Sequence, residues 1–430
     1  MKKLFILLII IIEYIFDEYL TYRIWKQRSK PLPEEVKDIY DHDRYLEFIE
    51  YKKAYKKVIG INKFISLIIS LVVLFSPLFN LIDSLSNNVY LIVLYSILII
   101  DTISIIISII YDYYCTFKIE EQFGKNHKTL KIFIKDELLE NVFGYLVNII
   151  LQMLFVMVVE YLISIDHINI LKAILIVGII VLVFTIIILV IMFISVLVMK
   201  TQYQFTDLDN SSLLDTINQL QSDAKKKVKH ITVYNESSKS NSKNAFLLKL
   251  LWYREFSIAD NFLNENDHRE ILAVFSHEIG HLKHKKDIYD YVKYLLLVVV
   301  VLLVVYLVSN ISIVKVFVES INDVYGLNTN NYYLIMMIIG IYLKPVMFII
   351  ETASNYISRR NEYEADYNAI KNGYGKELIK TFKDLSSDEL VDVYPDQLVE
   401  ILKFNHPGMY NRIKFILKKD KELNEKNNIS

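Results

Sequence analysis

The sequence predicts an all-α, multi-pass membrane protein, and three features of its composition support this fold class. Of the 430 residues, 53% are hydrophobic, and the mean hydropathy of +0.32 is too apolar for an ordinary soluble protein. Charged residues make up 23% of the chain, which is too many for a protein made only of membrane spans. Glycine (10) and proline (6) are scarce, and strand-like alternation occurs only in short pieces at 228–234 and 255–260, so helix should dominate.

Seven apolar stretches are long enough, or nearly so, to cross a membrane as helices, which takes about 20 residues. They lie at 4–21, 64–83, 90–112, 143–164, 172–199, 291–310 and 332–357. The first stretch resembles a signal peptide, but acidic residues interrupt it and no small-residue cleavage site follows. We therefore interpret it as a retained span.

The distribution of Lys and Arg predicts which side of the membrane each loop faces, because cytoplasmic loops keep positive charge. Segment 22–63 has eleven basic residues and segment 200–290 has thirteen, whereas loops 84–89 and 165–171 have none and loop 311–331 has one. This alternation puts the N-terminus outside. The segments expected in the cytoplasm are 22–63, 113–142, 200–290 and 358–430.

Four acidic residues, Glu13, Asp17, Asp101 and Glu160, fall inside or near the predicted spans. Ionisable groups within a membrane usually face a wet interior, so we expect a water-filled chamber among the helices. The alternative is that these side chains lie at span ends and reach the interface, which fits Asp17 equally well but fits Asp101 poorly.

Charge and cysteine content exclude two classes of function. The formal net charge of -1, with no long block of one sign, gives no basic face for nucleic acid. The single cysteine, Cys115, forms no internal disulfide and no Cys-rich zinc site. Any metal must therefore be held by His and carboxylate groups.

The segment 270–281 has helical periodicity and puts His277 and His281 one turn apart on one face. This is the H-E-x-x-H pattern, in which two imidazoles hold one zinc ion. Glu278 lies beside the first ligand, where it can take a proton from the attacking water and pass it to the leaving amine. The simpler interpretation is a solvated helix end, because residues 283–286 are basic.

A catalytic zinc needs a third protein ligand and one open position for water. Directly after the last predicted span, Glu362 and Asp366 share a helical face, on the same side of the membrane as the histidines by charge bias. Glu362 can then complete a His-His-Glu set for one zinc ion per chain, while Asp366 orients a ligand imidazole. Glu364 points elsewhere on the helix. Taken alone, such an acidic cluster is more often a solvated face.

Five separated motifs resemble those of the CAAX prenyl protease 1 family, integral-membrane zinc endopeptidases with seven spans. They occur in the family's order through most of the chain. The motifs are I-E-E-x-x-G-x-N at 119–126, S-N-A-[YF] at 243–246 (here K-N-A-F), H-E-[IL]-G-H at 277–281, S-R-x-x-E-[YF]-x-A-D at 358–366 and H-P-x-x-x-x-R at 406–412.

The resemblance implies removal of the aaX tripeptide from prenylated CAAX proteins by zinc-activated water, and it selects Glu362 as the third ligand. It further implies that Asn244 pairs with substrate backbone, that His406 binds substrate or the oxyanion, and that Arg412 braces the site by pairing with Asp366. From the residues alone, a helix-capping His406 and a surface Arg412 are the simpler interpretations.

The chain departs from the family pattern at two places. The family's His-Ser-Asn-Ala is Ser242-Lys243-Asn244-Ala245 here, and its Pro-Pro after the histidine is Pro407-Gly408. These changes affect the substrate cleft and leave the predicted metal ligands intact.

We expect four parts: helices 1 to 5 with their loops (1–199), a catalytic segment (200–290), helices 6 and 7 (291–357) and a C-terminal catalytic segment (358–430). The catalytic parts should form a zincin-like domain at the cytoplasmic interface of a monomer. Its partners would be the lipid bilayer and a prenylated or membrane-associated polypeptide. The membrane would be the endoplasmic reticulum in a eukaryote and the plasma membrane in a prokaryote.

Three other functions remain as alternatives. An intramembrane protease of the site-2 type has its H-E-x-x-H inside an apolar span, which the basic residues 283–286 disfavour. A broader quality-control metalloprotease shares the motif layout but has about four spans. A non-enzymatic membrane protein with structural zinc would usually need four protein ligands, and three converge here.

Overall fold

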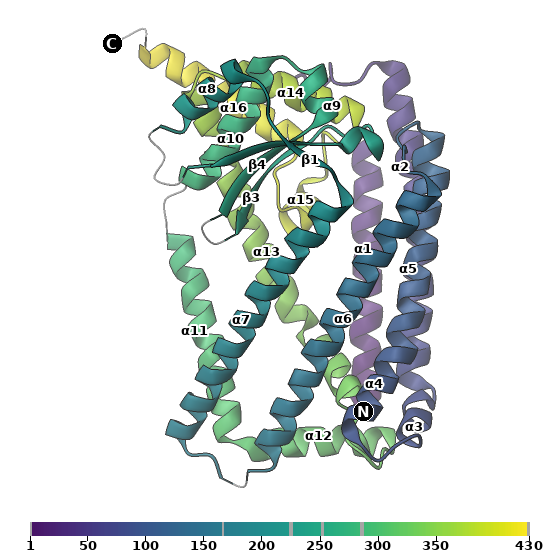
Figure 1. Cartoon of the computed structure of the whole chain (residues 1–430). Helices are drawn as coiled ribbons and strands as arrows, with labels where there is room; N and C mark the ends of the chain where they lie inside the picture. Colours follow the sequence, from purple (N-terminus) through teal and green to yellow (C-terminus); the bar gives the residue numbers. More distant parts are fainter. Residues whose placement is uncertain (1, 166, 223–226, 251–252, 284–287, 428–430) are drawn as a thin grey trace.

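Long helices stand side by side in the structure, and a smaller unit that contains a β-sheet lies at one of their ends (Figure 1). The computed structural model describes residues 2–165, 167–222, 227–250, 253–283 and 288–427. Each of the seven predicted spans overlaps a helix. These helices are α1 (Lys2–Arg28), α2 (His42–Phe75), the continuous run α4, η1, α5 and η2 (Val89–Ser96, Ile97–Asp101, Thr102–Tyr114 and Cys115–Glu120), α6 (Leu130–Ile163), α7 (Ile170–Gln202), α11 (Ile288–Ser309) and α13 (Tyr332–Lys371).

Five helices among the described residues are long and apolar enough to cross a membrane: α2, the run from α4 to η2, α6, α7 and α13. The helices Val298–Ser309 and Ile311–Tyr325 meet at 81° and add a sixth span if they are counted as one. Helix α1 is not in this set, and its predicted span carries Glu13, Asp17 and Glu18. A mainly helical, multi-pass membrane fold is therefore confirmed.

Two predicted boundaries at the far end of the helices are wrong. The predicted span 64–83 runs past the end of α2 at Phe75, where Pro77 follows and residues Leu78–Asp83 form the separate helix α3. Proline lacks the N–H that would continue the helix, which explains the break. The predicted loop 311–331 instead contains helix α12 (Ile311–Tyr325), which ends at Gly326 in the left-handed conformation with φ 66°.

The basic and non-basic loops gather at opposite ends of the long helices. Figure 1 shows the sheet and the C-terminal helices at one end, and α3, α12 and the N-terminus at the other. Ion pairs tie the basic ends of the early helices to the acidic segment 386–396. They are Arg23–Asp396 at 2.8 Å, Arg28–Asp392 at 2.7 Å and Lys125–Glu389 at 3.0 Å. The loops that carry positive charge thus contact the same unit, as the alternation of Lys and Arg predicts.

The sheet has four strands among the described residues, in the order β1-β2-β4-β3. The strands are β1 (Phe205–Asp207), β2 (His230–Tyr234), β3 (Ala245–Leu250) and β4 (Tyr253–Ala259). Strands β2 and β4 pair in parallel and the other pairs are antiparallel, so β3 is an edge strand. The two predicted strand pieces correspond to β2 and β4, whereas β1 and β3 were not predicted.

Helices complete the unit. They are α8 (Ser211–Leu220), α9 (Asp260–Glu265), α10 (His268–Lys283), α14 (Gly375–Asp388), α15 (Gln397–Lys403) and α16 (Met409–Asn427), and residues Glu236–Ser238 form the short helix η3. Of these helices, α9 and α10 pack directly against the sheet. The rings of Phe256 on β4 and Phe275 on α10 meet edge to face, with centroids 5.0 Å apart. Both side chains are fully buried, so α10 is held against the sheet by apolar packing.

A cavity of about 560 Å³ lies among the long helices, and its largely apolar lining includes several polar side chains. Its lining includes Asp101 and Asn148, together with Gln152 and Tyr333. The Asp101 carboxylate accepts hydrogen bonds from the Asn148 amide and the Tyr333 hydroxyl, each at 2.6 Å. Asp101 therefore bonds to side chains of two other helices at a cavity, and the water-filled chamber stays a prediction.

Candidate metal centre

Helix α10 carries the first three predicted site residues. The helix begins after Asp267, whose carboxylate accepts a hydrogen bond from the Glu270 backbone N–H at 3.0 Å and caps the first turn. Residues at helical spacing, Ile271, Phe275 and Ile279, are buried on the sheet side. This packing fixes the rotation of the helix, so that His277 and its neighbour one turn later face α13 instead of the sheet.

The two histidines of the motif lie next to each other on this face. The rings of His277 and His281 are nearly perpendicular, at 89°, with centroids 4.9 Å apart. Ligand atoms of these two residues and of Glu278 all lie within 4.8 Å of one another. The basic residues 284–286 that favoured a solvated helix end lie outside the described residues.

Helix α13 brings the predicted third ligand to the histidine pair. Oε2 of Glu362 lies 3.5 Å from Nε2 of His277, and Oε1 of Glu362 lies 3.3 Å from Nε2 of His281. Ligand atoms about 2.0–2.1 Å from a tetrahedral zinc are separated by about 3.3–3.4 Å, so these spacings suit one ion. Both Glu362 and His277 are buried, which favours a shared cation over solvated charges.

Asp366 lies behind the first histidine and in turn contacts Arg412. Oδ1 of Asp366 is 3.0 Å from Nδ1 of His277. The guanidinium of Arg412 donates two hydrogen bonds to the same carboxylate, from Nη2 at 2.6 Å and from Nε at 3.0 Å. Because Asp366 occupies Nδ1, the imidazole presents Nε2 to Glu362. Arg412 is only 7% exposed, so the interpretation as a surface residue is wrong.

Opposing effects act on the pKa of His277. Burial lowers the pKa, but the hydrogen bonds with Asp366 and Glu362 raise it more, to about 9. The His277 imidazole thus lies between the carboxylates of Asp366 and Glu362, whose negative charge attracts a cation. This electrostatic setting also favours a metal cation.

His406 and Asn244 both line the cavity of about 260 Å³ that opens onto the histidine pair. The His406 side chain is 58% exposed, and its Nε2 lies 3.4 Å from Oε1 of Glu362. Its Nδ1 lies 2.8 Å from Oδ1 of Asn405. Asn244 directly precedes β3, and its backbone carbonyl accepts a hydrogen bond from Ala259 N–H at 2.9 Å.

Glu364 lies away from this cluster, as predicted. Its side chain is exposed, and Oε1 lies 3.8 Å from Nε of Arg360 on the same helix. All eight predicted site residues, in contrast, are brought together: His277, Glu278, His281, Glu362, Asp366, Arg412, His406 and Asn244.

The sequence did not identify the apolar walls of the cavity. They are Phe262, Val274, Leu378, Phe382 and Leu385, from α9, α10 and α14. Leu378, Phe382 and Leu385 lie at helical spacing, which indicates a buried face but not what it faces. Another unpredicted feature joins α10 to α13, where Asn368 donates to the Ser276 carbonyl at 2.6 Å.

The structure shows specific contacts at Lys243 and Gly408, the two places where the chain departs from the family pattern. Lys243 lines the cavity, and its ammonium contacts Asp388 at 2.7 Å and Glu265 at 2.8 Å. The Gly408 N–H donates to Oε1 of Glu400 at 2.9 Å, a bond that proline cannot form.

Comparisons with known proteins agree with this architecture. The family model described as CAAX prenyl protease N-terminal, five membrane helices, matches residues 21–200, and the model described as Peptidase family M48 matches residues 207–420. The crystal structure of S. mikatae Ste24p shares the fold, with a TM-score of 0.80 at 23% identity over 97% of this chain and 99% of that one.

Curated relatives include CAAX prenyl proteases and a metalloprotease. Probable CAAX prenyl protease 1 of Schizosaccharomyces pombe is 27% identical over 72% of this chain and 62% of its own length. CAAX prenyl protease 1 of Saccharomyces cerevisiae is 25% identical over 94% of this chain and 92% of its own length. The uncharacterized metalloprotease YhfN of Bacillus subtilis is 27% identical over half of each chain. The chain thus belongs to the CAAX prenyl protease 1 family of M48 metallopeptidases.

Proposed function

We propose that this protein is a zinc-dependent membrane endopeptidase that removes the aaX tripeptide from prenylated CAAX proteins. The observation that carries the proposal is the buried contact of Glu362 with both Nε2 atoms of His277 and His281, at 3.5 and 3.3 Å. The names of the fungal relatives support the choice of substrate.

In this proposal His277, His281 and Glu362 hold one zinc ion per chain. Three protein ligands leave a position open, which is typical of catalytic zinc and not of structural zinc. When bound, zinc would polarise the scissile carbonyl and make water a better nucleophile. The imidazole and carboxylate donors suit zinc, and the chain offers no cluster of cysteines as an alternative.

Glu278 is the proposed general base. It is next to His277 in the helix, and its carboxylate lies within 4.8 Å of both histidine ligand atoms, close enough to reach a water at the open position. The same carboxyl group, once protonated, can deliver the proton to the departing amine nitrogen. Its side chain lines the cavity, so it can approach a substrate there.

The other site residues have supporting roles. The exposed His406 can donate a hydrogen bond to the oxyanion, because its ring borders the cavity. Asp366, paired with Arg412, keeps the His277 ring oriented and keeps its Nε2 available.

Substrate would lie in an extended conformation beside Asn244, at the edge strand β3. An edge strand presents backbone N–H and C=O groups that a peptide can pair with. The site lies where α13 leaves the predicted span 332–357 and reaches Glu362. A lipidated C-terminus at the interface could enter without leaving the bilayer, since each buried methylene adds roughly 0.8 kcal/mol of membrane affinity.

The proposal keeps the four-part division of the chain at 199/200, 290/291 and 357/358, with the catalytic parts on the cytoplasmic side of a monomer. Its membrane would be the endoplasmic reticulum in a eukaryote and the plasma membrane in a prokaryote. Its partners are a prenylated or membrane-associated polypeptide and the bilayer.

The test compares cleavage of farnesylated and unprenylated peptides ending in Cys-a-a-X by purified protein, together with its zinc content. Glu278→Gln should retain zinc and lose at least 100-fold in turnover, in line with about 10²–10⁴ for general acid–base catalysis. Glu364→Gln, an exposed acid near the site, is the matched control. Undiminished turnover of Glu278→Gln would end the proteolytic proposal, and equal cleavage of both peptides would favour a broader quality-control protease.

A further inference from the structure

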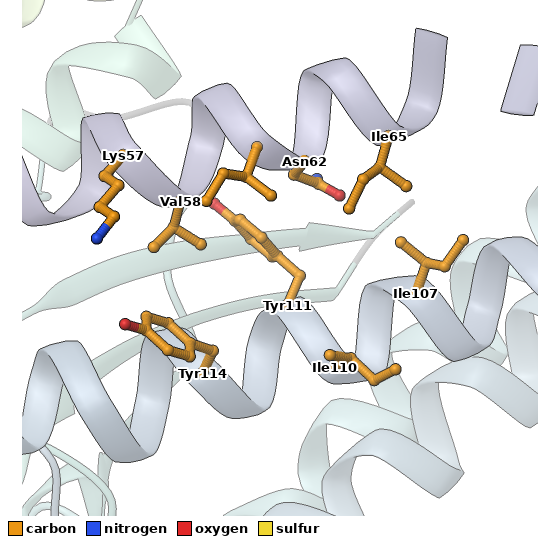
Figure 2. Close-up of a pocket in the computed structure, with 9 residues that line it drawn as sticks. Lys57, Val58, Asn62, Ile65, Ile107, Ile110, Tyr111 and Tyr114 are labelled. Carbon is orange, nitrogen blue, oxygen red and sulfur yellow. The ribbon is translucent and has the colours of Figure 1, made fainter. Parts of the chain in front are cut away.

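A groove lies between α2 and α5, and none of the residues that line it lines the cavity at the candidate metal centre. Its volume is about 410 Å³, and it is lined largely by apolar side chains. Val58 and Ile65 contribute from α2, and Ile107 and Ile110 contribute from α5 (Figure 2). Ile65 and Ile110 are exposed, so among the described residues no other element seals the groove.

The two ends of the groove differ in polarity. Figure 2 shows Lys57 and Tyr114 at one end and Ile65 and Ile107 at the other. Residues 57 and 65 are about 12 Å apart along a helix at 1.5 Å per residue. The groove thus has the length and polarity of the upper part of a lipid, with a head at one end and a chain at the other.

The polar end is the end nearer the sheet. Helix α2 starts at His42 beside the sheet and runs away from it, so Lys57 comes before the predicted span at 64. Lys and Tyr at this depth are typical of the interface between headgroups and hydrocarbon. Beyond the polar end, α2 and η2 are in direct contact, because the Tyr51 hydroxyl donates to the Glu120 carboxylate at 2.7 Å.

Lys57 is available for a ligand. Among the residues that the structure describes, it has no ion pair, hydrogen bond or ring contact. Three other lysines of α2 have partners: Lys56 lies over the Trp25 ring at 4.7 Å, Lys52 lies over the Tyr51 ring at 4.9 Å, and Lys63 lies 3.8 Å from Glu18. A free ammonium at the headgroup level is complementary to a phosphate.

We propose that this groove binds one anionic phospholipid. An acyl chain would lie between Ile65 and Ile107, and the phosphate would contact Lys57, with the Tyr114 hydroxyl as a second donor. Such a lipid would fill the space between α2 and α5 below the Tyr51–Glu120 contact and stabilise their pairing. The inference does not depend on the proteolytic function.

The experiment uses delipidated full-length protein in detergent, titrated with phosphatidylglycerol or phosphatidylcholine. Native mass spectrometry counts bound lipids, and thermal unfolding measures stabilisation. Wild-type protein should retain one phosphatidylglycerol with an affinity about fivefold or more above that for phosphatidylcholine. Lys57→Gln should remove this preference, whereas Lys56→Gln, an equal change of charge one residue away, should retain it.

A second variant tests the apolar half of the site. Ile110→Trp puts a large side chain into the groove and should lower the affinity for both lipids. Equal affinities for the two lipids in wild-type protein, equal losses in the two lysine variants, or unchanged binding by Ile110→Trp would each overturn the proposal. Cooperative thermal unfolding of each variant without added lipid reports that the protein is folded.

Discussion

Gly280 of α10 contacts the backbone of Ala365 of α13 directly. A Cβ atom at position 280 would lie 2.6 Å from the Cα atom of Ala365 and 3.1 Å from its Cβ and carbonyl oxygen. The contact falls between the histidines of α10 and the acidic residues Glu362 and Asp366 of α13. The glycine of H-E-x-G-H thus sets how closely the helices cross, and with it the distance between the proposed ligands.

Gly280→Ala should destabilise the protein and weaken the metal site. The two helices must separate to admit the methyl group, and overpacking of this kind costs about 1–3 kcal/mol. Thermal unfolding and zinc content measure the two effects. Gly340→Ala is the control, because a Cβ at this helical position meets nothing within 4 Å. It should be neutral or stabilising by up to about 1 kcal/mol, and equal stability of the two variants would contradict the prediction.

Asp366→Asn should weaken zinc binding by about 10- to 100-fold, the usual effect of removing a carboxylate that orients a ligand histidine. The 3.0 Å contact with Nδ1 of His277 is lost as a charged interaction, and Arg412 is left buried beside a neutral amide. Competition with a chromogenic chelator gives the affinity. Glu364→Gln should bind zinc like the wild type, and an unchanged affinity in Asp366→Asn would show that Asp366 does not position the ligand.

Gly408→Pro, which restores the family's residue, should destabilise this chain. Proline removes the N–H that donates to Glu400 at 2.9 Å, and a Cβ at this position would lie 2.7 Å from Cγ of Pro395. We expect a loss of about 1–3 kcal/mol, because the buried Glu400 carboxylate loses this hydrogen bond while the one from the Asn411 amide remains. We also expect a higher KM, because His406 is two residues away. A variant as stable as the wild type in thermal unfolding would refute this account, and Glu400→Gln, which keeps an acceptor oxygen, is the milder comparison.

The proposed metal-site residues could be predicted because their signal is local. His277 and His281 are four residues apart on one helix, and Glu362 and Asp366 are four apart on another, so helical geometry alone aligns each pair. Helix α12 also carried a readable signal: Ile311, Val318, Ile321 and Tyr325 are buried at helical spacing. The prediction of a loop there overlooked this periodicity.

Other features depend on contacts between distant segments. Arg412 lies 46 residues from Asp366, and no local pattern distinguishes a buried arginine from an exposed one. Strand β3 (Ala245–Leu250) is apolar except for Lys249 and shows no regular alternation of apolar and polar residues. Its strand conformation follows from pairing with β4, which the sequence pattern does not reveal.

Glu255 should make the protein sensitive to acid. This fully buried carboxylate on β4 accepts hydrogen bonds from Lys200 at the end of α7 (2.6 Å), from the Tyr253 hydroxyl (2.5 Å) and from Thr232 (2.7 Å). Burial raises the pKa of Glu255, but these hydrogen bonds outweigh it, so the pKa falls below its ordinary value of 4.5. The carboxylate therefore stabilises the folded state fully above about pH 4.5, and this stabilisation is lost as the pH falls through the folded pKa.

Glu255→Gln should be less stable than the wild type at pH 7, by about 1–3 kcal/mol, because Lys200 loses its charged partner. Below pH 4.5 the difference should shrink, since the wild-type carboxylate becomes protonated while the amide does not titrate. Thermal unfolding in detergent from pH 7 to pH 3 measures both curves, and Glu364→Gln should follow the wild type throughout. Parallel curves for the wild type and Glu255→Gln would mean that Glu255 does not link the sheet to the membrane helix through its charge.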